Sequence, residues 1–138
     1  MATQTRYFNA YDLHRIRGFL ELATEGGSER YRYLVGLKQE LESSVILAPE
    51  EMPPEVVTMN SQVRIHDAGS RSTVAVTLVF PQEADYDQKK VSLLAPLGAA
   101  LLGRHAGEEV SYDAPGGRTT ILIEEILYQP EAAREYSL

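Results

Sequence analysis

The first third of the chain carries apolar residues at helical spacing. One apolar face repeats at intervals of three, four and three residues: Leu13, Ile16, Leu20 and Ala23. Asn9 is a suitable N-cap for this helix, and Asp12 stands where a capping-box carboxylate would lie. The pair Gly26-Gly27 then ends the pattern, as glycine commonly does at helix C-termini.

A second helix is expected after this glycine pair, with Ser28 as its N-cap. Its apolar face is Leu34, Leu37 and Leu41, extended by Val45. Two helices joined by a tight turn bury their apolar faces against each other. The pattern therefore predicts a short antiparallel helical hairpin, or short coiled coil, over residues 1–48.

Three prolines in residues 49–55 predict an extended Pro-rich linker. From residue 56 to 138 the apolar period changes from helical to alternating. This predicts strands near 62–66, 73–80, 109–112 and 119–128, an apolar bridge at 91–94 and one short helix starting at Pro96. The second part is thus an antiparallel sheet with one helix, and the whole chain is α+β.

Composition restricts the possible functions. The net charge is −7, and the acidic excess lies after residue 48. Because DNA-binding proteins need a basic face for phosphate contacts, direct DNA binding is not expected. Cysteine is absent, which excludes disulfides and thiolate chemistry, and no long apolar run or signal-like N-terminus predicts a membrane or secreted protein. We expect a cytoplasmic monomer.

Catalytic motifs are not evident. The histidines His14, His66 and His105 have no metal-ligand spacing, and no P-loop or nucleophile elbow occurs. We interpret the histidines and the pairs Glu108-Glu109 and Glu124-Glu125 as solvated surface groups. The sequence predicts no cofactor, no metal and no enzymatic activity.

The turn between the predicted helices holds the one notable polar group. Glu25 and Glu29 flank Gly26, Gly27 and Ser28. Two carboxylates at the end of a projecting hairpin could hold a metal ion in the active site of another protein. Alternatively, Glu29 complements the positive N-terminal end of the second helix and Glu25 is only exposed. The residue types alone favour this alternative.

Three segments resemble the Gre family of transcript-cleavage factors, in particular its Rnk group (regulator of nucleoside diphosphate kinase). They are residues 51–61 with Val-Thr-Met-Asn-Ser, residues 95–103 with Ala-Pro-Leu-Gly-Ala-Ala-Leu-Leu-Gly followed by Gly107, and residues 128–133 with Tyr-Gln-Pro-Glu-Ala-Ala. The resemblance implies an FKBP-like C-terminal domain that binds bacterial RNA polymerase at the rim of its secondary channel.

In Gre factors, carboxylates in the tip sequence Gly-Asp-Leu-Ser-Glu-Asn help to hold a metal ion that activates water. Here Ser28 and Glu29 match Ser-Glu, but Gly26 stands at the Asp position. A helix of about 15 residues also reaches only about 22 Å, and Gre hairpins are longer. The resemblance therefore implies docking without cleavage, in competition with Gre factors. A genuine cleavage-stimulating factor is the alternative.

The docking contact implied by the resemblance is Leu94, Ala95, Pro96 and Leu97. Pro96 matches the Gre pattern, whereas Ala95 and Leu94 replace a common Ser and a common acidic residue. Leu93, Leu94 and Leu97 are equally compatible with the core. Prolyl isomerase activity, suggested only by the FKBP-like fold, is disfavoured because the second part has Phe80 as its one Phe and no Trp.

Overall fold

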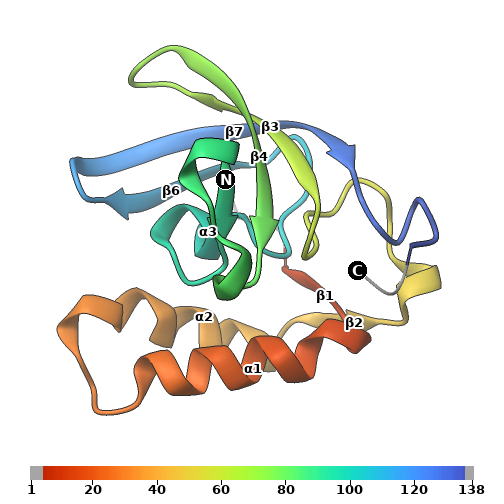
Figure 1. Cartoon of the computed structure of the whole chain (residues 1–138), viewed down its shortest axis with the longest axis horizontal. Coiled ribbons are helices and arrows are strands. Elements are labelled where there is room, and N and C mark those ends of the chain that lie inside the picture. Colours follow the sequence, from red (N-terminus) through yellow and green to blue (C-terminus); the bar gives the residue numbers. More distant parts are fainter. Residues whose placement is uncertain (1–4, 136–138) are drawn as a thin grey trace.

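Two helices lie side by side along one edge of the molecule, and a curved sheet lies over them (Figure 1). The computed structural model describes residues 5–135. Helix α1 spans Ala10–Thr24 and α2 spans Arg32–Glu42. The side chain of Asn9 accepts a hydrogen bond from the backbone N–H of Tyr11, which confirms the predicted N-cap.

The second helix begins and ends differently from the prediction. Ser28 caps a 3-10 turn, η1 (Glu29–Tyr31), and the α-helix starts only after it. Strand β2 (Val45–Leu47) contains Val45, which therefore does not extend the apolar helix face. The hydroxyls of Ser43 and Ser44 donate to backbone carbonyls in the last turn of the helix. The backbone N–H of Val45 donates to the backbone carbonyl of Arg6, outside the helix.

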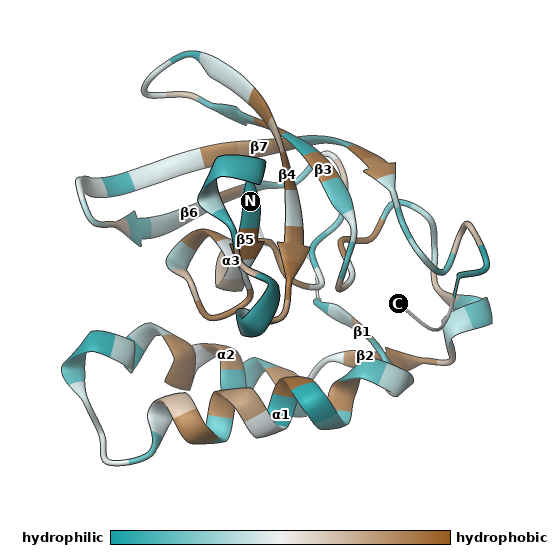
Figure 2. Cartoon of the chain, in the orientation of Figure 1, coloured by the Kyte–Doolittle hydropathy of each residue, from teal (hydrophilic) through white to brown (hydrophobic). Residues whose placement is uncertain are grey.

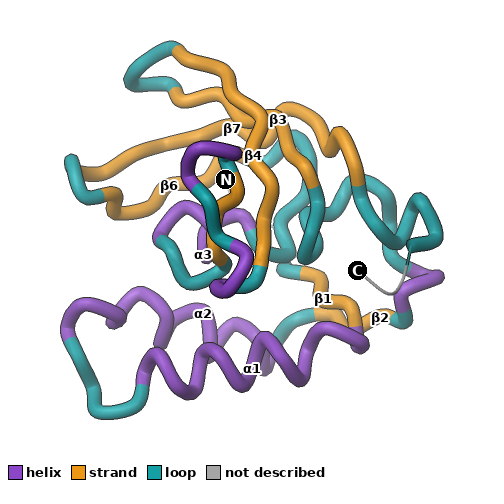
Figure 3. Tube along the Cα trace, in the orientation of Figure 1, coloured by secondary structure: helices purple, strands orange, loops and turns teal. Residues whose placement is uncertain are grey.

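Strand β1 (Tyr7–Asn9) pairs in parallel with β2 at the end of the helices opposite the turn between them (Figure 3). The chain after β2 is not an extended linker throughout. Pro49–Glu51 form a 3-10 turn, η2, with proline at a first-turn position where its missing N–H costs nothing. Met52, directly after this turn, is buried.

The five-stranded sheet has the order β5-β4-β3-β7-β6. Its strands are β3 (Gln62–Asp67), β4 (Ser72–Val79), β5 (Lys90–Ser92), β6 (Glu109–Ala114) and β7 (Gly117–Tyr128). The sheet is not wholly antiparallel as predicted, because β5 runs parallel to β4. Two 3-10 turns, η3 (Pro81–Glu83) and η4 (Tyr86–Gln88), carry the chain back before β5 begins.

Helix α3 (Pro96–Leu101) starts at proline as predicted. One hydrophobic cluster joins both parts of the chain, since it contains Leu20 and Leu34 of the helices together with Leu78, Leu101 and Ile123 of the sheet part. The end of β4 that lies toward the helices is correspondingly hydrophobic (Figure 2). The helices are therefore packed onto the sheet part and share its core.

Candidate functional site

The segment of residues 94–97, called loop 94–97 below, leads into α3, and Pro96 and Leu97 are the first two residues of that helix. Its four residues are half-buried, whereas Leu93 is completely buried and belongs to the core. The backbone N–H groups of Leu94 and Ala95 donate to the side chain and the carbonyl of Ser92, each at 3.0 Å. The loop thus has a defined shape and presents part of each side chain at the surface.

Gly98 explains why this loop needs its Pro-Leu-Gly sequence. A Cβ atom at Gly98 would lie 1.9 Å from the carbonyl oxygen of Ser92, far inside van der Waals contact. Because backbone cannot yield as a flexible side chain can, only glycine lets α3 lie this close to β5. Packing between these two elements fixes where Pro96 and Leu97 lie.

An apolar cavity of about 420 Å³ opens beside the loop. Pro96 and Leu97 form one side of it, and Val74, Val76 and Tyr112 of the sheet form another. A cavity lined in this way accepts an apolar side chain from a partner more readily than a charged one. The loop and the cavity together form a candidate docking surface.

The turn between α1 and α2, residues 25–29, is called the tip below. Gly26 and Gly27 both adopt positive φ, at 86° and 69°, where L-residues are strained. Glu25 and Glu29 are exposed, and Glu29 forms an ion pair with Arg32 at 3.1 Å. Glu29 begins η1 and precedes the first residue of α2, Arg32, so its interaction with the dipole of that helix stays a prediction.

Among residues 5–135, no group of three or more His, Asp or Glu side chains is arranged to hold a metal ion. In the same residues, no helix is long and apolar enough to cross a membrane.

Tyr33 connects the start of α2 to the loop. Its hydroxyl donates a hydrogen bond to the carbonyl oxygen of Leu94. Burial raises the pKa of Tyr33 above the usual tyrosine value, so the phenol keeps its donor proton at physiological pH. The sequence offered no signal for this contact, because it joins residues that are far apart in the chain.

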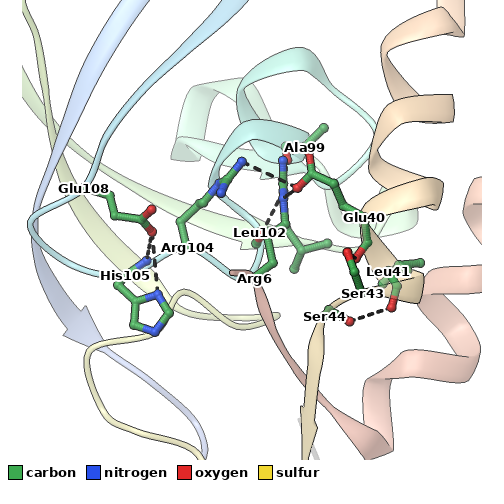
Figure 4. Close-up of polar contacts among 10 residues, drawn as sticks. All are labelled: Arg6, Glu40, Leu41, Ser43, Ser44, Ala99, Leu102, Arg104, His105 and Glu108. Atoms are coloured by element: carbon green, nitrogen blue, oxygen red, sulfur yellow. Dashed lines mark hydrogen bonds and ion pairs between the residues drawn. The ribbon is translucent and has the colours of Figure 1, made fainter. Parts of the chain in front are cut away.

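A buried arginine connects the other end of α3 to the N-terminal part (Figure 4). Arg6 donates to the carbonyl oxygens of Ala99 at 2.6 Å and Leu102 at 2.8 Å, and to the carboxylate of Glu40 at 2.5 Å. Arg104 lies 3.6 Å from the same carboxylate. Burial, with Arg104 nearby, lowers the pKa of Arg6.

His105 and Glu108 are not the solvated surface groups that the sequence predicted. Both are buried, and Glu108 accepts a hydrogen bond from the backbone N–H of His105 at 2.6 Å. The imidazole of His105 also packs edge-on against Tyr7 at 4.6 Å between ring centroids. The carboxylate satisfies a buried backbone donor in the turn before β6, and no sequence motif marks such a role.

The C-terminal segment after β7 binds two other parts of the chain, residues 53–58 and Asn9. The Gln129 amide donates to the carbonyls of Pro53 and Val56, at 2.7 and 2.9 Å. The buried Glu131 carboxylate accepts from Thr58 at 2.7 Å and from Asn9 at 2.6 Å. Two of the segments that carried the family resemblance are therefore in direct contact.

Comparison with known proteins identifies relatives of this chain. The family model described as "Transcription elongation factor, GreA/GreB, C-term" matches residues 52–128. The chain is 37% identical to the "Regulator of nucleoside diphosphate kinase" of Escherichia coli strain K12, over the full length of both. It is also 35% identical over 80 residues to "Transcription elongation factor GreA" of Nitratidesulfovibrio vulgaris, covering 58% of this chain and 50% of that protein.

A solved structure has a similar fold. The "Prokaryotic transcription elongation factor GreA/GreB from Nitrosomonas europaea" superposes with a TM-score of 0.73 at 35% identity, covering 91% of this chain and 99% of that one. These similarities confirm the resemblance to Gre factors and to the Rnk group, and they support a regulator of the elongation-factor type. The chain belongs to the GreA/GreB family of transcription elongation factors.

Proposed function

We propose that the chain is a non-enzymatic transcription regulator that binds bacterial RNA polymerase at the rim of the secondary channel. The docking contact is Leu94, Ala95, Pro96 and Leu97 with the apolar cavity beside them. The observation that carries this proposal is that Pro96 and Leu97 are held at the surface and line this cavity. Both lie in the region that matches the GreA/GreB family model.

Within this proposal, residues 1–48 act as a short hairpin directed into the channel. Residues 49–55 connect the hairpin to an FKBP-like domain of residues 56–138, whose sheet and single helix α3 support that description. The predicted absence of direct, sequence-specific DNA contact is part of the same proposal, because the polymerase provides the contact with nucleic acid.

The hairpin is too short to deliver a carboxylate to the polymerase metal ion. Helix α1 has 15 residues, which corresponds to about 22 Å. Of the two tip carboxylates, Glu29 is already paired with Arg32. We therefore expect the protein to occupy the Gre site and compete with Gre factors without stimulating RNA cleavage.

Cleavage stimulation is the second candidate function, and the exposure of the tip favours it. Both tip carboxylates point to solvent, and Ser28-Glu29 matches the Gre tip. Backtracked elongation complexes separate the two functions. We expect no RNA cleavage with this protein alone and suppression of Gre-stimulated cleavage on titration. Cleavage by the protein alone would establish the second function and contradict the first.

Replacing Pro96 with Asp tests the docking contact. The charge enters an apolar surface, and we expect at least a ten-fold loss of polymerase affinity in co-sedimentation, with the fold intact. Pro81→Asp is the matched control, because Pro81 is also half-buried and also begins a helical turn. Equal binding by both variants would refute the assignment of loop 94–97.

A further inference from the structure

Two side chains from the N-terminal part hold α3 at both of its ends. Tyr33 donates to the carbonyl of Leu94, just before the helix. Arg6 donates to the carbonyls of Ala99 and Leu102, in its last turn. The loop proposed to bind the polymerase therefore lies between two contacts that come from outside its own part of the chain.

Contacts with other elements orient helix α3, and the two side chains from the N-terminal part add to the packing of Gly98 on β5. The helix has six residues and no side-chain N-cap, so it cannot fix its own orientation strongly. The last carbonyls of any helix lack partners within the helix, and a buried guanidinium is well suited to them through charge and multiple donors. Glu40 lies between Arg6 and Arg104 and balances part of their charge.

We infer that Tyr33 and Arg6 are positioning residues for polymerase binding, through which the helix pair holds loop 94–97 in its binding shape. This inference rests on the proposed function. The two residues do not touch the polymerase themselves in this scheme. They lower the conformational cost of docking by keeping the loop ordered in the free protein.

The helix pair has further attachments, so the positioning contacts can be tested without detaching it. The guanidinium of Arg15 lies 4.2 Å from the centre of the Phe80 ring, and Phe19 packs on the same ring at 5.8 Å. The hydrophobic cluster spans both parts as well. Removing one hydroxyl from Tyr33 leaves all of these contacts in place.

The first test is the polymerase affinity of Tyr33→Phe. Loss of one hydrogen bond corresponds to about a three- to ten-fold weaker binding, with little change in melting temperature. Tyr11→Phe is the matched control, because Tyr11 is 69% exposed on the first turn of α1. We expect the control to bind like the wild type. Arg6→Lys should weaken binding further, because an ammonium group cannot reproduce the forked contacts of the guanidinium.

A second measurement separates positioning from general stability. Amide hydrogen exchange reports on the loop directly, because the backbone N–H groups of Leu94 and Ala95 donate to Ser92, and that of Ala99 donates to Ala95. We expect slow exchange at these amides in the wild-type chain and faster exchange when Tyr33→Phe and Arg6→Lys are combined. A folded double variant whose loop amides exchange as slowly as those of the wild type would overturn the inference.

The outcomes distinguish this inference from the proposed function. If the wild-type chain does not bind polymerase, both are overturned. If the wild type binds and Tyr33→Phe and Arg6→Lys bind equally well, the positioning role alone is overturned, and loop 94–97 keeps its docking role. Weaker binding by Tyr33→Phe than by Tyr11→Phe, together with faster exchange of the loop amides in the double variant, supports both.

Discussion

The two ends of the helix pair differ in how their polar groups are used. The end of the helix pair opposite the tip, where α1 begins, is called the base. There the side-chain oxygen of Asn9 accepts a hydrogen bond from the backbone of Tyr11, and its amide N–H donates to the carboxylate of the buried Glu131. At the tip, Glu25 and Glu29 are exposed, and the ion pair of Glu29 with Arg32 is exposed as well. Polar groups at the base are therefore buried and stabilise the fold, whereas the tip carboxylates are exposed, with Glu29 in a surface ion pair.

The substitution with the largest expected effect on the free energy of unfolding is Glu131→Ala, at the base. Removing the carboxylate leaves Thr58 and Asn9 with buried donors that have lost their acceptor, and we expect a loss of about 2 to 3 kcal/mol in the free energy of unfolding. Glu135→Ala is the control, because the exposed carboxylate of Glu135 accepts one hydrogen bond, from the hydroxyl of Tyr128, among the bonds between described residues. Urea denaturation of both variants measures the difference. A similar small loss in both would contradict the structural role of the base.

A smaller effect is expected at the tip, from Gly27→Ala. The new Cβ meets no atom within 4 Å, so only the positive φ of 69° opposes the change, at about 1 to 2 kcal/mol. Gly18→Ala in the middle of α1 also places a Cβ in open space, but at helical φ. We expect it to stabilise by about 0.5 to 1 kcal/mol. A melting temperature of Gly27→Ala equal to or above that of the wild type would show that the tip is not strained.

The smallest effect is a pH dependence at the base. Burial raises the pKa of Asp12 above the usual aspartate value, despite the ion pair with Arg15 at 3.1 Å. Because the pKa of Asp12 is raised in the folded state, its contribution to stability is complete at pH values below the pKa of the unfolded state. That contribution is lost as pH rises through the pKa of the folded state. At neutral pH the buried carboxylate is therefore unfavourable.

We accordingly expect Asp12→Asn to stabilise the chain at pH 7 by less than about 1 kcal/mol, an advantage that shrinks toward pH 4. Denaturation curves at several pH values measure it. Asp113→Asn, at an exposed ion pair on β6, provides the control. An advantage of Asp12→Asn that grows as pH falls would contradict the burial argument.

Sequence patterns predicted the local elements well, because local spacing determines them. The N-cap at Asn9, the helix beginning at Pro96 and the long strand ending at Tyr128 lie where apolar period, capping residues and turns indicated. Errors occurred where tertiary contacts overrode the local pattern. Val45 continues the helical spacing, yet pairing with β1 places it in a strand.

The site was predictable only in part. Pro96 and the tip carboxylates are found from motifs, because those residues are continuous in sequence. Arg6, Tyr33 and Glu40 could not be found, because each acts on a backbone atom or a side chain from a distant segment and none carries a local signature. The same reason explains why the buried Glu108 was interpreted as a surface charge.

The contact between Asn9 and Glu131 has a consequence for how the chain folds. It joins positions 122 residues apart in the chain. Contacts of such long range slow folding, because a long stretch of chain must be ordered before they can close. The start of α1 therefore gains its buried acceptor only once the intervening sheet has brought Glu131 to it, and the contact adds its stability late in folding.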